Sequence, residues 1–147
     1  MKRLIFKLLF ILSFWIFSAN TFLAQTEVKM VLGNPSSAVA NLNNPDNYLV
    51  VHSGFILSYN KDRGGANWVA WHLSKTHIAD AERTNAFAPD TSLPRDWWIK
   101  PTDLVLKGYD RGHLCPSEER TDSEENNRET FLMSNMVPQT SRLNRGA

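Results

Sequence analysis

Short runs of alternating hydrophobic and polar residues begin at residue 48. Residues 48–52 and 55–59 are rich in β-branched and aromatic side chains, and only Ser53 and Gly54 separate them. Two such runs with a two-residue link predict a β-hairpin. Residues 67–73 alternate well enough to predict a third strand. The pattern therefore predicts an antiparallel sheet early in the folded region.

A long polar segment separates this sheet from two further predicted strands. Residues 79–103 carry repeated proline and aspartate, which predicts irregular surface chain. Residues 108–114 predict a strand that ends or bends at Gly112, because glycine weakens a strand interior. Residues 131–137 predict another strand, and we expect Pro138 to stop it.

Helices are short and few in this pattern. Thr121 followed three residues later by Glu124 is a capping box, which predicts a helix over residues 124–130. A last helix is expected to begin within residues 143–147. Together the elements predict an α+β fold built mostly on antiparallel sheet.

The N-terminal segment has the layout of a secretory signal. Lysine and arginine occupy positions 2, 3 and 7, and residues 4–17 are otherwise apolar except for Ser13. This run is short and interrupted for a membrane span, so we expect cleavage near Ala24. The mature protein is then periplasmic or secreted, without stable membrane association. Phe22 fits the small-residue rule for cleavage poorly, which leaves a retained anchor as the alternative.

Composition sets limits on the part that follows the signal. Residues 25–47 are rich in Asn, Ser and Pro and predict a loop-rich leader, which leaves residues 48–147 as one small domain. The single cysteine excludes an internal disulfide framework. Without the three cations of the signal segment, 13 basic residues face 15 acidic ones, a net charge of −2. Any site for a polyanion must therefore depend on a few placed arginines.

Four consecutive residues, Asp110, Arg111, Gly112 and His113, combine groups suited to phosphodiester hydrolysis. An imidazole can take a proton from water near neutral pH. A guanidinium offers a planar fork to phosphate oxygens, and glycine lets neighbouring side chains converge on one spot. Four common residue types are weak evidence by themselves, and the alternative for His113 is a structural histidine.

Three carboxamides, Asn135, Gln139 and Asn144, lie on the last predicted strand and the turn after it. Their neutral oxygens suit Mg²⁺, or Mn²⁺ in its place, because such an ion keeps several waters and needs few protein atoms. Most of its charge would stay available to a phosphate group. The alternative for both asparagines is an ordinary turn or capping role.

With these residues in view, the sequence resembles the DNA/RNA non-specific endonucleases, a family with a ββα-metal (His-Me finger) active site. The resemblance runs in family order from about residue 48 to the end, over residues 66–71, 81–83, 108–117, 131–139 and 143–146. It implies an α+β fold with a ββα-metal unit. It also implies Mg²⁺-dependent hydrolysis of DNA and RNA with little sequence preference, leaving 5′-phosphate ends.

The resemblance implies a role for each carboxamide and for the histidine. His113 would be the general base that deprotonates the attacking water. Asn144 would be the one direct protein ligand of the metal. Asn135 would lie close by and help to hold the site, while Gln139 would fix the loop.

The resemblance also implies roles for three charged residues. Arg83 would contact the phosphate and stabilise its developing charge. Arg111 would support the active-site surface or the substrate backbone, and Asp110 would orient its neighbours without transferring a proton. In the family, the helix begun at Asn144 continues to a glutamate that would fall at about position 152. We therefore expect an incomplete domain whose final helix is truncated.

The residues leave other interpretations open besides a nuclease. The first is a truncated, inactive module that binds nucleic acid without cleaving it. A structural or adhesive periplasmic domain would leave the joint presence of His113, Asn135 and Asn144 unexplained. Cys115 stands two positions after His113 and would share its strand face, so a thiol nucleophile is the remaining possibility.

Overall fold

The first sheet contains the predicted hairpin. The computed structural model describes residues 29–146, so the predicted signal and its cleavage site lie outside the described residues. The sheet is antiparallel, with its strands in the order β1 (Tyr48–Val51), β2 (Ile56–Asn60) and β3 (Gly65–Ala70). All three predicted strands are confirmed, and the first turn lies at Ser53 and Gly54. β3 begins and ends earlier than the alternation predicted.

The second sheet has two antiparallel strands, β4 (Tyr109–His113) and β5 (Met136–Thr140). Gly112 pairs with Val137, and β4 continues through Gly112 to His113, so the strand does not end at the glycine. The bend expected as the alternative stays a prediction. The side chain of Gln139 lies over Gly112, where a larger residue would collide with it. Glycine is therefore needed here for close approach across the pair.

The strand expected over residues 131–137 is displaced. Met133–Asn135 form a 3-10 turn, η4, and β5 begins only at Met136 and passes through Pro138. Among the described residues β5 pairs with β4 alone, so its other edge is hydrogen-bonded to no strand. A proline on such an edge removes no hydrogen bond from a neighbouring strand, which explains why Pro138 does not stop it.

The helices α2 and α3, which lie in the second half of the described chain, are short. Helix α2 (Glu124–Glu129) is confirmed, but its N-cap is Ser123, whose Oγ accepts from the Asn126 amide at 3.1 Å. The predicted capping residue, Thr121, instead accepts from the amide of Ala79 at 2.8 Å. Helix α3 (Ser141–Asn144) begins earlier than predicted, because the Thr140 hydroxyl caps it by accepting from the Leu143 amide.

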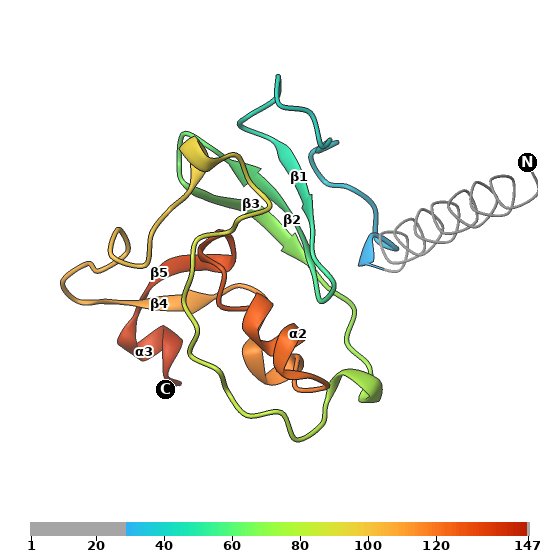
Figure 1. Ribbon diagram of the computed structural model, residues 1–147, viewed down its shortest axis with the longest axis vertical. Coiled ribbons are helices and arrows are strands. Elements are labelled where there is room, and N and C mark those ends of the chain that lie inside the picture. Colours follow the sequence, from blue (N-terminus) through green and yellow to red (C-terminus); the bar gives the residue numbers. More distant parts are fainter. Residues whose placement is uncertain (1–28, 147) are drawn as a thin grey trace, which may run out of the picture.

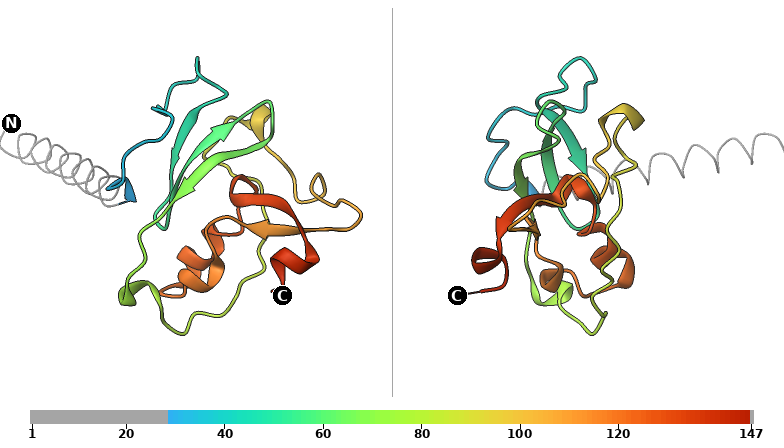
Figure 2. Two further views of the ribbon diagram at one scale, coloured as in Figure 1. Left: turned by 180° about the vertical axis from the view of Figure 1, so that it is seen from behind. Right: turned by 90° about the vertical axis from the view of Figure 1, so that its left-hand side faces the viewer.

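The first sheet and the irregular chain after it enclose the core. The segment between β3 and β4 is irregular, as its composition predicted, and holds only two 3-10 turns, η1 (Lys75–His77) and η2 (Arg95–Trp97). The core residues are Val50, Phe55, Leu57, Tyr59, Leu93, Trp97 and Cys115. Figures 1 and 2 show the three-stranded sheet at one end of the described chain, α2 and α3 at the other, and β4 and β5 between them. The expected α+β fold is confirmed.

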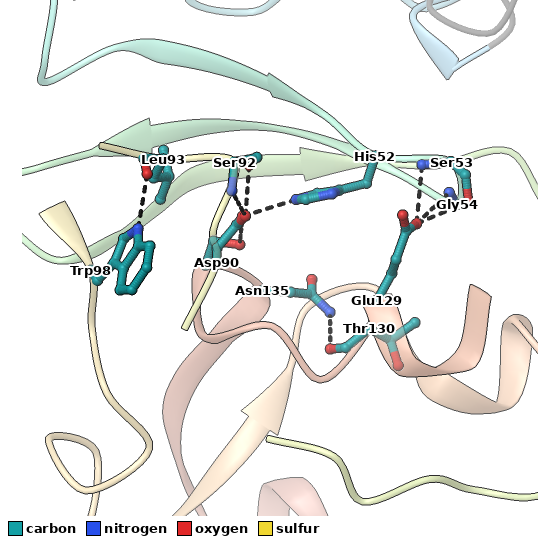
Figure 3. Close-up of polar contacts among 11 residues, drawn as sticks. His52, Ser53, Gly54, Asp90, Ser92, Leu93, Trp98, Glu129, Thr130 and Asn135 are labelled. Carbon is teal, nitrogen blue, oxygen red and sulfur yellow. Dashed lines mark hydrogen bonds and ion pairs between the residues drawn. The ribbon is translucent and has the colours of Figure 1, made fainter. Parts of the chain in front are cut away.

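A buried polar network joins the first sheet to the irregular segment and to η4 (Figure 3). His52, just after β1, places Nε2 2.9 Å from Oδ2 of Asp90 in the long irregular segment. The same oxygen accepts from the hydroxyl of Ser134 in η4, and Oδ1 accepts from Ser92. Burial alone would raise the pKa of Asp90, but the hydrogen bond and charge of His52, with the two serine hydroxyls, lower it to about 2. The carboxylate is therefore charged and fully engaged.

Candidate active site

Four of the residues predicted from sequence line one pocket. Arg83, His113, Gln139 and Asn144 face a volume of about 480 Å³, and the remaining lining residues are Pro116, Ser117, Glu118 and Arg145. The pairing of β4 with β5 brings the segments together, and α3 follows β5 directly. Asp110, Arg111 and Asn135 do not line this pocket.

His113 is the last residue of β4 and is half-buried. Its Nε2 atom is buried and has no hydrogen-bond partner in the described part of the chain. Burial, and secondarily the charge of Arg83, lower the pKa of His113 to about 4. The imidazole is therefore neutral at neutral pH, so one of its two ring nitrogens can accept a proton.

Arg83 approaches His113 from the irregular segment after β3. Its Nε donates to Oδ1 of Asn85 at 3.0 Å, and its Nη1 donates to the hydroxyl of Ser117. The guanidinium carbon also lies 4.8 Å from the ring centroid of Phe131. These contacts hold an otherwise exposed cation at the pocket wall, where it can meet an anion.

Gln139 lies across the strand pair from His113. Its Nε2 donates to the His113 carbonyl at 3.4 Å. A Cβ atom at Gly112 would stand 2.1 Å from the Gln139 side-chain carbon Cδ, so the carboxamide occupies the space that the glycine leaves open. Gln139 therefore contacts the chain at both Gly112 and His113.

Asn144 is held by its nitrogen. Its Nδ2 donates to Oδ2 of Asp110 at 3.3 Å, which leaves the amide oxygen free to act as a ligand. Arg145 donates to both oxygens of Asp110 at 2.8 and 2.7 Å. The hydrogen bond from Arg145 is the largest cause of a lowered pKa at Asp110. Asp110 therefore orients the residues at the end of α3.

Asn135 lies behind the pocket and is fully buried. Its Oδ1 accepts from the Cys115 amide at 2.9 Å, and its Nδ2 donates to the carbonyls of Cys115 and Thr130 at 3.0 and 2.8 Å (Figure 3 shows the last). All its polar atoms are thus used to hold the backbone that follows His113.

Cys115 belongs to the hydrophobic core and is fully buried. Burial raises the pKa of its thiol to about 12. The thiol is therefore protonated at neutral pH, and the nucleophile considered from the sequence has no support in the structure.

Some residues around the pocket were missed by sequence reasoning, and Arg111 lies outside the pocket lining. The guanidinium of Arg111 stacks 4.0 Å from the Phe87 centroid, outside the pocket lining. Ser117 and Arg145 enter the site through contacts with Arg83 and Asp110. Both belong to the sequence blocks that predicted the site, but neither carries a pattern that would indicate its partner.

The donor set fits a hydrated hard cation better than a cluster of anionic ligands. Within residues 29–146, no three His, Cys, Asp or Glu side chains gather into a metal-binding group. The Asn144 oxygen is a neutral ligand of the kind that Mg²⁺ accepts together with waters.

Comparison with solved structures places this arrangement in a known class. The chain superposes on a chain from a crystal structure of an EndoG/EndoGI complex with a TM-score of 0.69 and 29% identity, covering 84% of this chain and 49% of the other. The fold is that of the ββα-metal nucleases.

Sequence comparison narrows the class to one family. The family model described as "DNA/RNA non-specific endonuclease" matches residues 32–147, and the chain belongs to this family. A nuclease of Nostoc sp. is 49% identical over 119 residues, which is 80% of this chain and 43% of the relative. A nuclease of Syncephalastrum racemosum is 40% identical over 71% of this chain and 34% of the relative. The chain thus spans less than half the length of these relatives.

No helix in the described range, 29–146, is both long and apolar enough to cross a membrane.

Proposed function

We propose that this chain carries the catalytic centre of an exported, Mg²⁺-dependent endonuclease that hydrolyses phosphodiester bonds of DNA and RNA with little sequence preference. One observation supports the proposal most strongly. A neutral imidazole shares a pocket with a guanidinium held by hydrogen bonds and a free amide oxygen, those of His113, Arg83 and Asn144. Family membership supports nucleic acid as the substrate.

The chemistry assigned to the residues is a hydrolysis in which His113 is the general base. A ring nitrogen of the neutral imidazole takes a proton from a water in the pocket, and the water oxygen attacks phosphorus. The bond from phosphorus to the 3′ oxygen breaks in line with the attack, and that oxygen takes up a proton from solvent. The products carry a 5′-phosphate and a 3′-hydroxyl. Arg83 offers its fork to the phosphate oxygens, which gain charge as the reaction proceeds.

Asn144 is the residue that would hold the metal ion through its amide oxygen. Asp110 fixes the amide nitrogen, which turns the oxygen away from the carboxylate. When bound, Mg²⁺, or Mn²⁺ in its place, supplies positive charge against the charge that develops on the phosphate.

The test of the nuclease activity uses the 147-residue chain with supercoiled plasmid and with RNA, in Mg²⁺ and in EDTA. We expect cleavage of both substrates in Mg²⁺ alone, and a loss of about 10²–10⁴ in rate for His113→Ala. His72→Ala is the matched control, because His72 is exposed and lies outside the pocket. Equal cleavage by His113→Ala would disprove the base assignment. Binding of nucleic acid without cleavage by the unaltered chain would favour the non-cleaving module.

Export has a separate test. Expression with the complete leader in a bacterium with a periplasm, followed by N-terminal sequencing, is expected to show a mature protein that begins near Gln25. A product that keeps residues 4–17 in the membrane fraction would support the retained anchor.

A further inference from the structure

A buried aromatic ring stands behind the base of the proposed site. Phe131 is fully buried, and its ring centroid lies 4.6 Å from that of His113 with the two planes at 88°. The ring of Phe87 is nearly perpendicular to the ring of Phe131, with the two centroids 5.1 Å apart. Perpendicular aromatic contacts at these distances are attractive and depend on orientation. The plane of the imidazole is therefore set by packing against Phe131.

The same ring also contacts the pocket's cation. The guanidinium of Arg83 lies over Phe131 at 4.8 Å from the centroid, within the range of a cation–π interaction. Arg83 is exposed, and its long side chain has many alternative rotamers in solution. A ring that attracts the guanidinium reduces that freedom at the position facing the pocket.

The backbone holds the ring in place from two sides. The Phe131 amide donates to the carbonyl of Arg128 at the end of α2, at 3.0 Å, and its carbonyl accepts from the Ala88 amide at 3.3 Å. The Met133 amide in turn donates to the carbonyl of Ala88 at 2.9 Å. Phe131 therefore sits on a rigid junction between α2, the irregular segment and η4.

We propose that Phe131 is a positioning residue that fixes both the base and the phosphate-binding arginine of this site. The catalytic part of this inference rests on the proposed function. The contacts themselves do not depend on it. One ring that packs against His113 and Arg83 sets their separation, so the base and the cation reach a phosphate together.

The contact with His113 is tested by NMR, without reference to activity. The chain has four histidines, and two of them pack against different buried phenylalanines: His113 against Phe131, and His52 against Phe55 at 4.8 Å. We expect Phe131→Leu to shift the ring resonances of His113 alone. Phe55→Leu, the matched control, should shift those of His52 alone. Unchanged His113 resonances in folded Phe131→Leu would overturn the proposal.

The contact with Arg83 is tested with a substitution that keeps the shape of the ring. Trifluorophenylalanine at position 131 weakens the negative face of the ring and leaves its packing nearly unaltered. We expect binding of a single-stranded oligonucleotide in EDTA to weaken about two- to fivefold, the size of a partly exposed cation–π contact. The same replacement at position 55 should change nothing. In an Arg83→Ala background the effect at position 131 should disappear, and an undiminished effect would overturn the proposal.

Cleavage measurements then separate the two proposals. In Mg²⁺, Phe131→Leu is expected to lower kcat, through His113, and to raise KM, through Arg83, whereas Phe55→Leu changes neither. A loss that appears equally in both variants reflects stability alone and would overturn the positioning role. If the unaltered chain binds but does not cleave, the proposed function fails. The binding assay would still test the contact between Phe131 and Arg83, because it does not require cleavage.

Discussion

At the scale of single residues, the site depends on one histidine that its surroundings keep neutral. An unperturbed imidazole titrates near pH 6.5. In His113 burial, followed by the charge of Arg83, lowers the pKa to about 4. Both causes act against the imidazolium form, so the proposed base is available over a wider pH range than the residue type alone would predict.

This pKa predicts how the activity depends on pH. A base is active when it is deprotonated, so kcat/KM should stay level as pH falls through 6.5 and decline only as pH approaches about 4. Arg83→Gln removes a charge that opposes protonation, so the decline should move to higher pH but remain below 6.5 because burial persists. A decline centred at 6.5 in the unaltered chain would contradict the burial argument. Cleavage rates at subsaturating substrate between pH 3.5 and 8 provide the measurement.

A second residue-scale prediction concerns the space over Gly112. A Cβ there would lie 2.1 Å from the Gln139 side chain, so Gly112→Ala should lower the free energy of unfolding by about 1–3 kcal/mol. Adding Gln139→Ala removes the obstacle and should restore most of the loss. Gly65→Ala is the control within a strand, because nothing lies within 4 Å of a Cβ at that position. Urea unfolding measures all four proteins, and equal losses for both single glycine variants would exclude the steric explanation.

At the scale of elements, β4, β5 and α3 bring distant residues to one pocket. His113 pairs with Met136 at the start of β5, and α3 begins where β5 ends. Asp110, near the start of β4, accepts from Asn144 and Arg145 at the other end of this unit. A strand pair and one helical turn thus bring an imidazole and a carboxamide, 31 positions apart in the chain, to the same pocket.

The Asp110 contacts lead to a prediction about the metal. Asp110→Asn loses the charge that holds Arg145 and weakens the grip on Asn144. The Mg²⁺ concentration that gives half-maximal cleavage should therefore rise several-fold, with little change in the melting temperature. Asp96→Asn is a matched control, because Asp96 forms an exposed ion pair with Lys61 at 3.1 Å and neither residue lines the pocket. Identical Mg²⁺ curves for Asp110→Asn and the unaltered chain would argue against this role.

At the scale of the whole molecule, buried polar groups connect the first sheet to the part that carries the site. Asp90 accepts from Ser134, whose neighbour Asn135 holds the chain after His113, and it pairs with His52 beside β1. A buried charge with several partners costs much stability when one partner is removed. This network therefore links the stability of the sheet to the geometry of the pocket.

Removal of the central carboxylate should be strongly destabilising. Asp90→Ala leaves His52 and Ser134 without their buried partner, and we expect a loss of about 3–5 kcal/mol in the free energy of unfolding at pH 7. Asp103→Ala, at an exposed turn where the carboxylate accepts from the Lys100 amide, should cost far less. Because the folded pKa of Asp90 is lowered from 3.8 to about 2, its contribution is complete above pH 3.8 and decreases as pH falls through 2. An acid-unfolding profile that is unchanged in Asp90→Asn would contradict this.

The sequence by itself determined the local features of this protein. The hairpin at Ser53 and Gly54, helix α2 and the order of the family blocks all depend on neighbouring residues. Through the blocks that resemble the family, the sequence also predicted four site residues that the structure brings into one pocket: Arg83, His113, Gln139 and Asn144.

Tertiary structure alone decided the rest. Pro138 lies inside β5 because one edge of that strand has no partner in the described chain, and η4 takes the place of the first part of the expected strand. The lowered pKa of His113 and its contact with Phe131 come from burial, and so does the internal bonding of Asn135. Burial and packing depend on segments far apart along the chain, and no local pattern records which of them will meet.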